Sequence, residues 1–343
     1  MALLTAPLIV RRPEDAAEDR QQVVMLLHDL SFAPPEEVLA SLGVGAMAGM
    51  DHGAPAAEHD MGAMDGMTGG MAMDVNDIAF DAYLANDRTL DDPEAVAVEP
   101  GGRVRLRVVN AASATAFWID TASVPAALVA VDGEDVEPLQ GSRFGLSMGQ
   151  RVDLLLDLPA GGGAWPVLAL REAATERAGL VLATPSAAVR RLPVMGGAAS
   201  PVFDADLAQE GALRARVPLF ERPAERNATL MLQGQMSPYR WTIDGGAWPD
   251  TRPIEARSGE RVELTFHNTS MMAHPMHLHG HAFQVVDVGR GRFAGAVRDT
   301  VLVPPMAAVT VALDAGEAAR WMLHCHHMPH LATGMMTTLD VAA

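Results

Sequence analysis

Residues 101–110, GGRVRLRVVN, and residues 259–268, GERVELTFHN, carry Gly, Arg, Val, Leu and Asn at matching places. In both segments apolar and polar residues alternate, which is the period of a strand with one buried face. A second pair of similar segments, FDAYLAND at 80–87 and YRWTIDGG at 239–246, precedes them at nearly the same offset. Two matches in register indicate an internal repeat, and we predict an all-β fold of two related sandwich domains.

The repeat also sets the expected domain boundaries. We expect the first complete sandwich at 21–185 and the second at 229–343. An extended connector that contains Pro and Arg is expected between them, at 186–228. Residues 1–20 begin with an apolar run, MALLTAPLIV, which we interpret as a further strand. Its basic pair follows the run instead of preceding it, so the run is a poor secretory signal.

Composition limits the classes of partner. The 343 residues carry a formal charge of −18, which argues against nucleic acid because phosphates need a basic surface. No stretch reaches the roughly 18 apolar residues that a membrane helix needs. The single cysteine excludes an intramolecular disulfide and leaves an intermolecular pair, a free thiol or a metal ligand. The charge is compatible with metal cations and small organic molecules.

The segment HPMHLHGH at 274–281 is the first of two segments whose histidines are spaced as metal ligands. On an extended strand, residues two apart point to the same face. His277 and His279 can therefore present two imidazoles to one centre, while His274 is free to reach another.

The first sandwich has lost this feature. Counting on from the Asn that both copies share, His277 and His279 correspond to Ile119 and Thr121. We therefore expect the first sandwich to lack this metal site and to act as a spacer and an interface.

The segment WMLHCHHMPHLATGMM at 321–336 holds the single cysteine, four histidines and four methionines. By the same alternation, His324 and His326 point one way and Cys325 points the other. One strand would then contact two metal sites on opposite faces. Because Cys325 is bonded to both neighbours, an electron at one site has a short covalent route to the other.

The two sites differ in their donors. A thiolate, two imidazoles and a long axial thioether form the ligand set of a blue-copper electron-transfer site. All-imidazole sites suit Cu, Zn, Fe or Ni and do not name the metal by themselves. The expected blue-copper ligands are His274, Cys325, His330 and Met335, and the expected all-imidazole ligands are His277, His279, His324 and His326.

Each residue taken alone has a simpler interpretation. A lone histidine is usually packed or exposed, and a lone buried cysteine usually behaves as a small hydrophobic residue. Eight candidate ligands at these spacings in two strand-like segments favour the metal interpretation. His267, His281 and His327 match no ligand position, and we interpret them as residues around the sites or at the surface.

HPMHLHGHAFQVV and HCHHMPHLATGM resemble the two C-terminal copper motifs of the multicopper oxidases, the family of laccases and bacterial cuprous oxidases. The resemblance implies two cupredoxin-like domains, with type 1 copper at the thiolate site and type 2 and type 3 copper at the imidazole site. It implies that His277 ligates type 2 copper and that His279, His324 and His326 ligate the type 3 pair. Electrons would pass from a reductant through His324, Cys325 and His326 to O2, giving water.

The chain departs from the family in one respect. The family's three-copper cluster uses eight histidines, four of them from two His-x-His motifs in an N-terminal domain. No such motif precedes His277 here. The strand at 1–20 resembles the end of that domain, so we expect Met1 to be an internal methionine and the first domain to be left out. Such a chain would hold type 1 copper without reducing O2 efficiently.

Two other interpretations stay open. The chain can be complete and work as a non-enzymatic two-domain copper carrier or buffer. Alternatively, two chains can each give four imidazoles to a shared cluster. Nitrite-reductase-like proteins also have two such domains, but they resemble this chain poorly around the cysteine.

A methionine-rich insert is expected at 43–74. Its Gly- and Ala-rich composition predicts disorder, and its methionines can be incidental to a flexible loop. Thioethers are also soft Cu(I) ligands, and the segment resembles inserts of copper-resistance oxidases, which favours Cu(I) over a phenol as the reductant. By the same resemblance the location would be the periplasm. The candidate Cu(I) ligands are Met47, Met50, His52, His59, Met61, Met64 and Met67.

Overall fold

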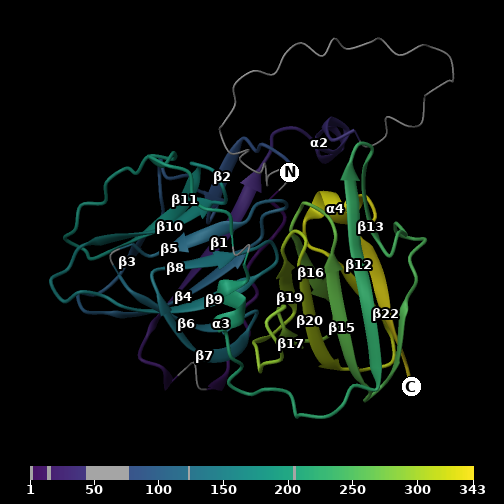
Figure 1. Ribbon diagram of the computed structural model, residues 1–343. Helices are drawn as coiled ribbons and strands as arrows, with labels where there is room; N and C mark the ends of the chain where they lie inside the picture. Colours follow the sequence, from purple (N-terminus) through teal and green to yellow (C-terminus); the bar gives the residue numbers. More distant parts are fainter. Residues whose placement is uncertain (1–2, 14–16, 44–76, 123, 204–205) are drawn as a thin grey trace, which may run out of the picture.

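The computed structural model describes residues 3–13, 17–43, 77–122, 124–203 and 206–343. The chain forms two β-sandwiches that lie side by side, one coloured purple to teal and the other green to yellow in Figure 1. Each sandwich consists of a six-stranded and a five-stranded sheet. The predicted all-β, two-sandwich fold is confirmed.

The first sandwich has the sheet orders β2-β1-β4-β9-β6-β7 and β3-β11-β10-β5-β8. Its elements are β1 (Gln21–Leu30), α2 (Pro35–Ser41), β2 (Ala82–Ala85), β3 (Ala95–Ala97), β4 (Arg103–Asn110), β5 (Phe117–Asp120), β6 (Ala126–Val131), β7 (Glu134–Gly141), β8 (Arg143–Leu146), β9 (Arg151–Asp157), β10 (Ala164–Arg171) and β11 (Arg177–Ala183).

The second sandwich repeats this topology strand for strand, as β13-β12-β15-β20-β17-β18 and β14-β22-β21-β16-β19. The two segments that are alike in sequence, β4 and β15, occupy the same place in their sheets. Its elements are β12 (Arg226–Met236), β13 (Tyr239–Ile243), β14 (Ile254–Arg257), β15 (Arg261–Asn268), β16 (His274–Leu278), β17 (Phe283–Asp287), β18 (Val297–Arg298), β19 (Thr300–Val303), β20 (Ala308–Asp314), β21 (Arg320–Cys325), α4 (Met328–Ala332) and β22 (Met336–Ala342).

Alternating burial along the strands builds the two cores. In β10, buried residues alternate with half-buried ones along its whole length, as the period of two requires. Leu106 and Val108 of β4 and Leu264 and Phe266 of β15 are fully buried between the sheets. Each such side chain contributes about 1.5–3 kcal/mol relative to an exposed position.

The repeated asparagine closes the loop that follows each of these strands. The Asn110 side-chain amide donates to the carbonyls of Thr115 and Leu146, at 2.9 and 3.0 Å. The Asn268 amide donates to the carbonyls of Met272 and Val303, at 2.7 and 3.2 Å. In the second sandwich this clamp fixes the loop that leads directly into His274.

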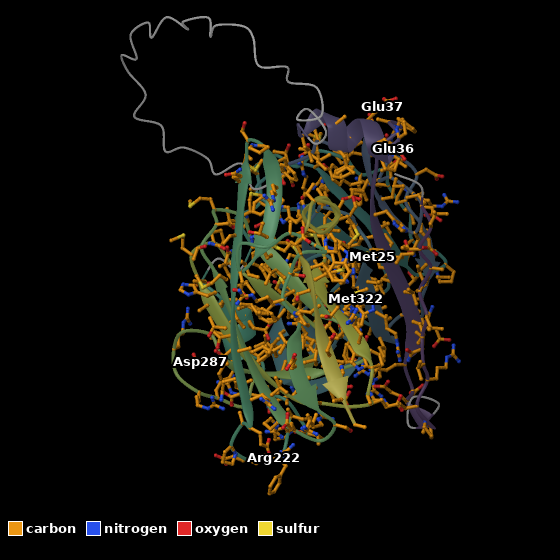
Figure 2. The ribbon with its side chains drawn as sticks, turned by 90° about the vertical axis from the view of Figure 1, so that its right-hand side faces the viewer. Met25, Glu36, Glu37, Arg222, Asp287 and Met322 are labelled. Carbon is orange, nitrogen blue, oxygen red and sulfur yellow. The ribbon has the colours of Figure 1, made fainter. Side chains whose placement is uncertain are left out.

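Helix α2 covers one end of the molecule, the end where α4 also lies (Figure 1). Glu36 and Glu37 on α2 point away from the body at that end, and Arg222 lies at the opposite end (Figure 2). Val38 packs with Ile78 in a small cluster under the helix. His330, one of the predicted ligands, belongs to α4 and so lies at this end.

The connector between the sandwiches is more buried than the sequence indicated. It contains a short helix, α3 (Ala208–Ala212), and its apolar side chains enter both cores. Leu213 belongs to the first core and Leu207 to the second. The extended surface connector predicted for 186–228 is therefore wrong for its middle, because burying these side chains is favourable.

The strand expected at the start of the chain is not formed in the described residues. Residues 3–12 have no ladder partner, and Leu4, Leu8 and Val10 are exposed. An unpaired extended segment has no neighbouring strand to satisfy its backbone groups. Among the helices of the described ranges, each is too short or too polar to cross a bilayer.

Candidate metal centres

Strands β16 and β21 lie next to each other and carry the predicted ligands. Met276 pairs with Cys325, and His277 pairs with His324. His274 and Cys325 face the buried interior, whereas His277 and His324 face the opposite side. The predicted division of one strand between two faces is present.

The buried cluster brings a thiol and two imidazoles together. The Cys325 Sγ lies 3.8 Å from His274 Nδ1 and 3.7 Å from His330 Nδ1, and the two nitrogens are 3.1 Å apart. All three side chains are fully buried. Three soft or borderline donor atoms therefore converge on one point.

The other nitrogen of each imidazole has its own partner. His274 Nε2 lies 2.8 Å from Ser270 Oγ, and this hydroxyl donates to Asn268 Oδ1. The hydroxyl therefore accepts from His274 Nε2–H. His330 Nε2 lies 3.3 Å from a carboxylate oxygen of Asp77. These partners fix the tautomers so that both Nδ1 lone pairs face Cys325, an arrangement typical of metal-ligating histidines.

Met335 lies on the same side. It is fully buried, belongs to the same core cluster as Cys325, and its carbonyl accepts from the Cys325 N–H at 3.1 Å. The site thus has a thioether residue next to the thiol, and its donor set fits the blue-copper ligand set.

The second cluster holds the other four imidazoles. The ring centroids of His277 and His279 are 4.9 Å apart, and His279 Nε2 lies 3.0 Å from His324 Nε2. The ring of His326 lies 5.8 Å from that of His277, and its Nδ1 is buried without a partner in the described chain. A metal ion bound by these rings would satisfy that nitrogen, so the cluster fits a metal.

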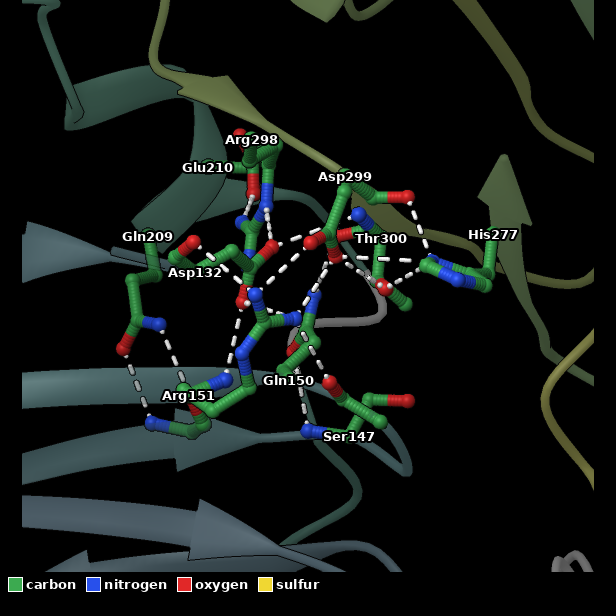
Figure 3. A network of polar contacts seen from close by, with 12 residues as sticks. Asp132, Ser147, Gln150, Arg151, Gln209, Glu210, His277, Arg298, Asp299 and Thr300 are labelled. Carbon is green, nitrogen blue, oxygen red and sulfur yellow. Dashed lines mark hydrogen bonds and ion pairs between the residues drawn. The ribbon is translucent and has the colours of Figure 1, made fainter. Parts of the chain in front are cut away.

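Contacts from both sandwiches orient this cluster. His277 Nδ1 lies 2.9 Å from the Asp299 carbonyl and 3.0 Å from Thr300 Oγ1. Asp299 is held by the Arg151 guanidinium through two contacts of 2.6 Å. Arg151 belongs to the first sandwich, so the first sandwich contacts an imidazole of the second through Asp299 (Figure 3).

A buried ion network continues from there. Arg298 contacts Asp132 at 3.0 Å and also Glu210, and all three side chains are almost fully buried (Figure 3). Gly149 contributes a close approach, because a Cβ there would lie 2.5 Å from the His326 ring and its φ is +77°. The interface is therefore built around the imidazole cluster.

Burial sets the charge of the site residues. Desolvation lowers the pKa of His274 and His330 well below the ordinary value, and lowers that of His324 and His326 to about 4. Desolvation raises the pKa of the Cys325 thiol. The imidazoles are therefore neutral, as metal ligation requires, and the thiol loses its proton only when a cation replaces it.

The strand register shows what replaces these ligands in the first sandwich. The two asparagine clamps and the pairs Phe117–Leu146 and His274–Val303 make Phe117 the counterpart of His274. Ala169, which pairs with Ile119, then takes the place of Cys325. Ala178 takes that of Met335, and no helix corresponds to α4.

The same register corrects one sequence equivalence. The loop after Asn110 is one residue longer than the loop after Asn268. Thr115 lies five positions after Asn110, whereas its counterpart Met272 lies four positions after Asn268. His277 therefore corresponds to Asp120 and His279 to Ala122, and not to Ile119 and Thr121. Ile119 is buried in the first core. The expectation that the imidazoles are absent holds.

Some site residues were not found from the sequence. Ser270, Asp77 and Asp299 orient the imidazoles, and only Asp299 had a usable signal, being a carboxylate close to a ligand strand. His267 is exposed and His281 is half-buried, whereas His327 is buried against His330.

The methionine-rich candidates lie outside the described residues. The predicted Cu(I) ligands from Met47 to Met67 all fall within 44–76, so their interpretation stays a prediction.

Comparison with known proteins adds the family. Two models, both described as multicopper oxidase, match residues 56–188 and 221–343. The multicopper oxidase MmcO of Mycobacterium tuberculosis is 34% identical over 274 residues, 78% of this chain and 52% of that protein. Copper resistance protein A of Escherichia coli is 33% identical over 120 residues, 35% of this chain and 20% of that protein.

The fold likeness extends further. The laccase from Botrytis aclada matches with a TM-score of 0.68 at 15% identity, over 94% of this chain and 64% of that one. This likeness shows the cupredoxin fold. The chain spans about half the length of MmcO.

Proposed function

Because this chain belongs to the multicopper oxidase family, we propose that it is an oxidoreductase that couples one-electron oxidation of a reductant to reduction of O2 to water. The observation that supports this most is the convergence of Cys325, His274 and His330 at 3.1–3.8 Å, with both Nδ1 lone pairs turned inward. The proposed type 1 copper ligands are these three residues and Met335.

The imidazole cluster is the proposed O2 side. His277 is proposed for type 2 copper, and His279, His324 and His326 for the type 3 pair. The family's cluster uses eight imidazoles, and the described residues bring four together. We therefore assign this chain the oxidation of the reductant and half of the cluster, with the other four imidazoles supplied from elsewhere.

Copper, when bound, supplies one-electron redox chemistry at both sites. The chain supplies the connection. Cys325 is covalently bonded to His324 and His326, and His324 Nδ1 also lies 3.0 Å from the Cys325 carbonyl. This short path of bonds joins the faces of β21. Burial of Cys325 excludes water from the thiolate and favours the sulfur–metal bond.

The reductant is proposed to be Cu(I) or a phenol, and the location the periplasm. The names of the relatives, which include copper resistance protein A and laccases, support both reductant classes. Fractionation of the native host would test the location. The rival function is a copper carrier or buffer without oxidase activity. The relatives' names favour the oxidase.

Loading with Cu(II) tests the proposal. We expect an intense blue absorption band from one copper per chain at the thiolate site, in addition to copper bound by the imidazoles, and bleaching of the band by one electron equivalent of reductant. Oxygen consumption should appear only when four further imidazoles complete the cluster. A chain that binds copper without a blue band would contradict the type 1 assignment. A blue chain that never supports O2 reduction, even with the missing imidazoles supplied, would favour the carrier.

A further inference from the structure

A cavity of about 300 Å³ lies between the two sandwiches, next to the buried thiol site. Ala114, Met148 and Glu172 of the first sandwich form one wall. The loop of Met271 and Met272, which leads into His274, forms much of the other. His327 lies in the wall nearest to the thiol site.

Methionines line this cavity from outside to inside. Met271 and Met306 are 64% and 66% exposed, whereas Met148 is buried and Met272 half-buried. Leucine side chains would make the cavity equally apolar, so apolarity alone does not explain the methionines. Thioether sulfurs add a preference for soft cations such as Cu(I).

The histidine in the cavity wall makes no hydrogen bond through its ring within the described part of the chain. His327 is 2% exposed, and neither of its ring nitrogens has a hydrogen-bond partner among the described residues. Asp77 Oδ1 is likewise buried and has no hydrogen-bond partner among the described residues. Each such atom costs about 1–3 kcal/mol when left unsatisfied.

These groups lie close enough to share an ion. Ligand atoms of Asp77, His327 and His330 all lie within 4.8 Å of one another. The His330 nitrogen already donates to Asp77 Oδ2, as does the Tyr239 hydroxyl. His327 and the second oxygen of Asp77 are left to bind a cation.

We propose that this cavity admits a cuprous ion and that His327 and Asp77 bind it at its inner end. A phenol would supply one hydroxyl donor, which leaves two of the three buried polar atoms unsatisfied, whereas an ion contacts an imidazole and a carboxylate together. The inference rests on the proposed function and narrows its reductant to Cu(I). The bound ion would lie beside the His330 ring, on which His327 stacks at 3.8 Å and 21°.

Silver(I) tests the site, because it is a soft monovalent cation that the protein cannot oxidise. The copper-loaded full chain, labelled with ¹⁵N-histidine, is reduced under anaerobic conditions and titrated with Ag(I). We expect a shift of one His327 ring nitrogen on silver binding. His327→Gln should weaken binding of one silver equivalent at least about tenfold, as expected for loss of a ligand. Met148→Leu, which keeps the volume, should weaken it less.

A matched control and a fold check accompany these variants. His267→Gln makes the same change at an exposed position of β15 and should leave silver binding unaltered. An unchanged blue band after reoxidation shows that His327→Gln still folds. If silver shifts a His327 nitrogen in the wild type but the oxidised, copper-loaded chain has no blue band, the result contradicts the proposed function and supports this site. Saturating silver that leaves the His327 nitrogens unmoved, or 2,6-dimethoxyphenol that occupies the cavity in its place, would overturn the inference.

Discussion

The two sandwiches have the same strand order and the same asparagine clamp, yet among the described residues only the second brings together the proposed metal ligands. Phe117, Ala169 and Ala178 fill the places of His274, Cys325 and Met335. Both sets are buried, so the fold accepts either apolar residues or ligands at these positions. The topology therefore does not determine the site, which depends on a few side chains and on the loop that contains α4.

The first sandwich has a different task. Its Arg151 holds Asp299, its Gly149 leaves room for the His326 ring, and its Asp132 contacts Arg298. A domain that has no ligands in the equivalent sheet thus braces the ligands of its partner. The sequence predicted that the first sandwich acts as a spacer and an interface. The structure shows how it does so, since its residues orient the imidazoles of the second sandwich.

Making the second sandwich like the first at one position should have the largest effect. Cys325→Ala copies Ala169, and we expect complete loss of the blue band and of one copper per chain. The fold should persist, because the first core tolerates alanine at this place. Absorption and copper analysis measure the first result, and circular dichroism the second. Retention of the band would contradict the assignment, because the chain has no second cysteine to supply a thiolate.

Breaking the interface should have the next largest effect. Arg298→Met leaves Asp132 and Glu210 buried without their cation, and we expect about 3–5 kcal/mol of destabilisation. Arg88→Met removes an exposed pair with Asp92 and should change stability by less than about 1 kcal/mol. Denaturant unfolding of the metal-free variants measures both. Equal effects would mean that the sandwiches do not stabilise each other through this network.

The cavity acid predicts a pH dependence. Desolvation raises the pKa of Glu172 to about 7, above the ordinary value of 4.5. The fold therefore holds the proton more tightly than the unfolded chain, and stability falls as pH rises from about 4.5 to 7. Glu172→Gln removes this loss, so its stability relative to wild type should rise by about 3 kcal/mol across that range. A difference that is flat with pH, measured on metal-free protein, would contradict this.

The bridge from Arg151 to His277 should have the smallest effect. Burial raises the pKa of Asp299, but hydrogen bonds with His277 and Arg151 outweigh this and lower it, so the carboxylate is charged at neutral pH. Asp299→Asn keeps the shape and removes the charge. We expect about 10–100-fold weaker Zn²⁺ binding by the imidazole cluster in the Cys325→Ala background. Asp287→Asn makes the same change at the end of β17, outside the contacts of the cluster, and should not alter the affinity.

The topology and the faces of the ligand strands could be predicted from the sequence, because both follow from the alternation of residues along short segments and from the repeat. Alternation in HPMHLHGH and in the segment around Cys325 fixes which side chains share a face, and the repeat fixes the topology. The counterpart of His277 was misassigned by one residue, since the extra residue in the loop after Asn110 leaves no mark in the repeat. A slip of one position turns a strand residue to the opposite face.

The orienting contacts could not be read in this way. Asp77 meets His330 across more than 250 positions of sequence, and Arg151 meets Asp299 across 148. Such contacts depend on how the two sandwiches pack against each other. Neither the alternation of apolar residues nor the composition encodes this packing. The burial of Leu207 and Leu213 in the connector has the same origin.

Electron paramagnetic resonance of the Cu(II)-loaded chain tests most directly whether β21 serves a separate metal on each side. Wild type is compared with Cys325→Ala, which removes a donor from the buried side, and with His279→Ala, which removes one from the other. We predict that the first variant loses only the narrow-splitting copper signal of the thiolate site, and that the second loses only copper bound by the imidazoles. A single signal that both variants abolish alike would contradict the account.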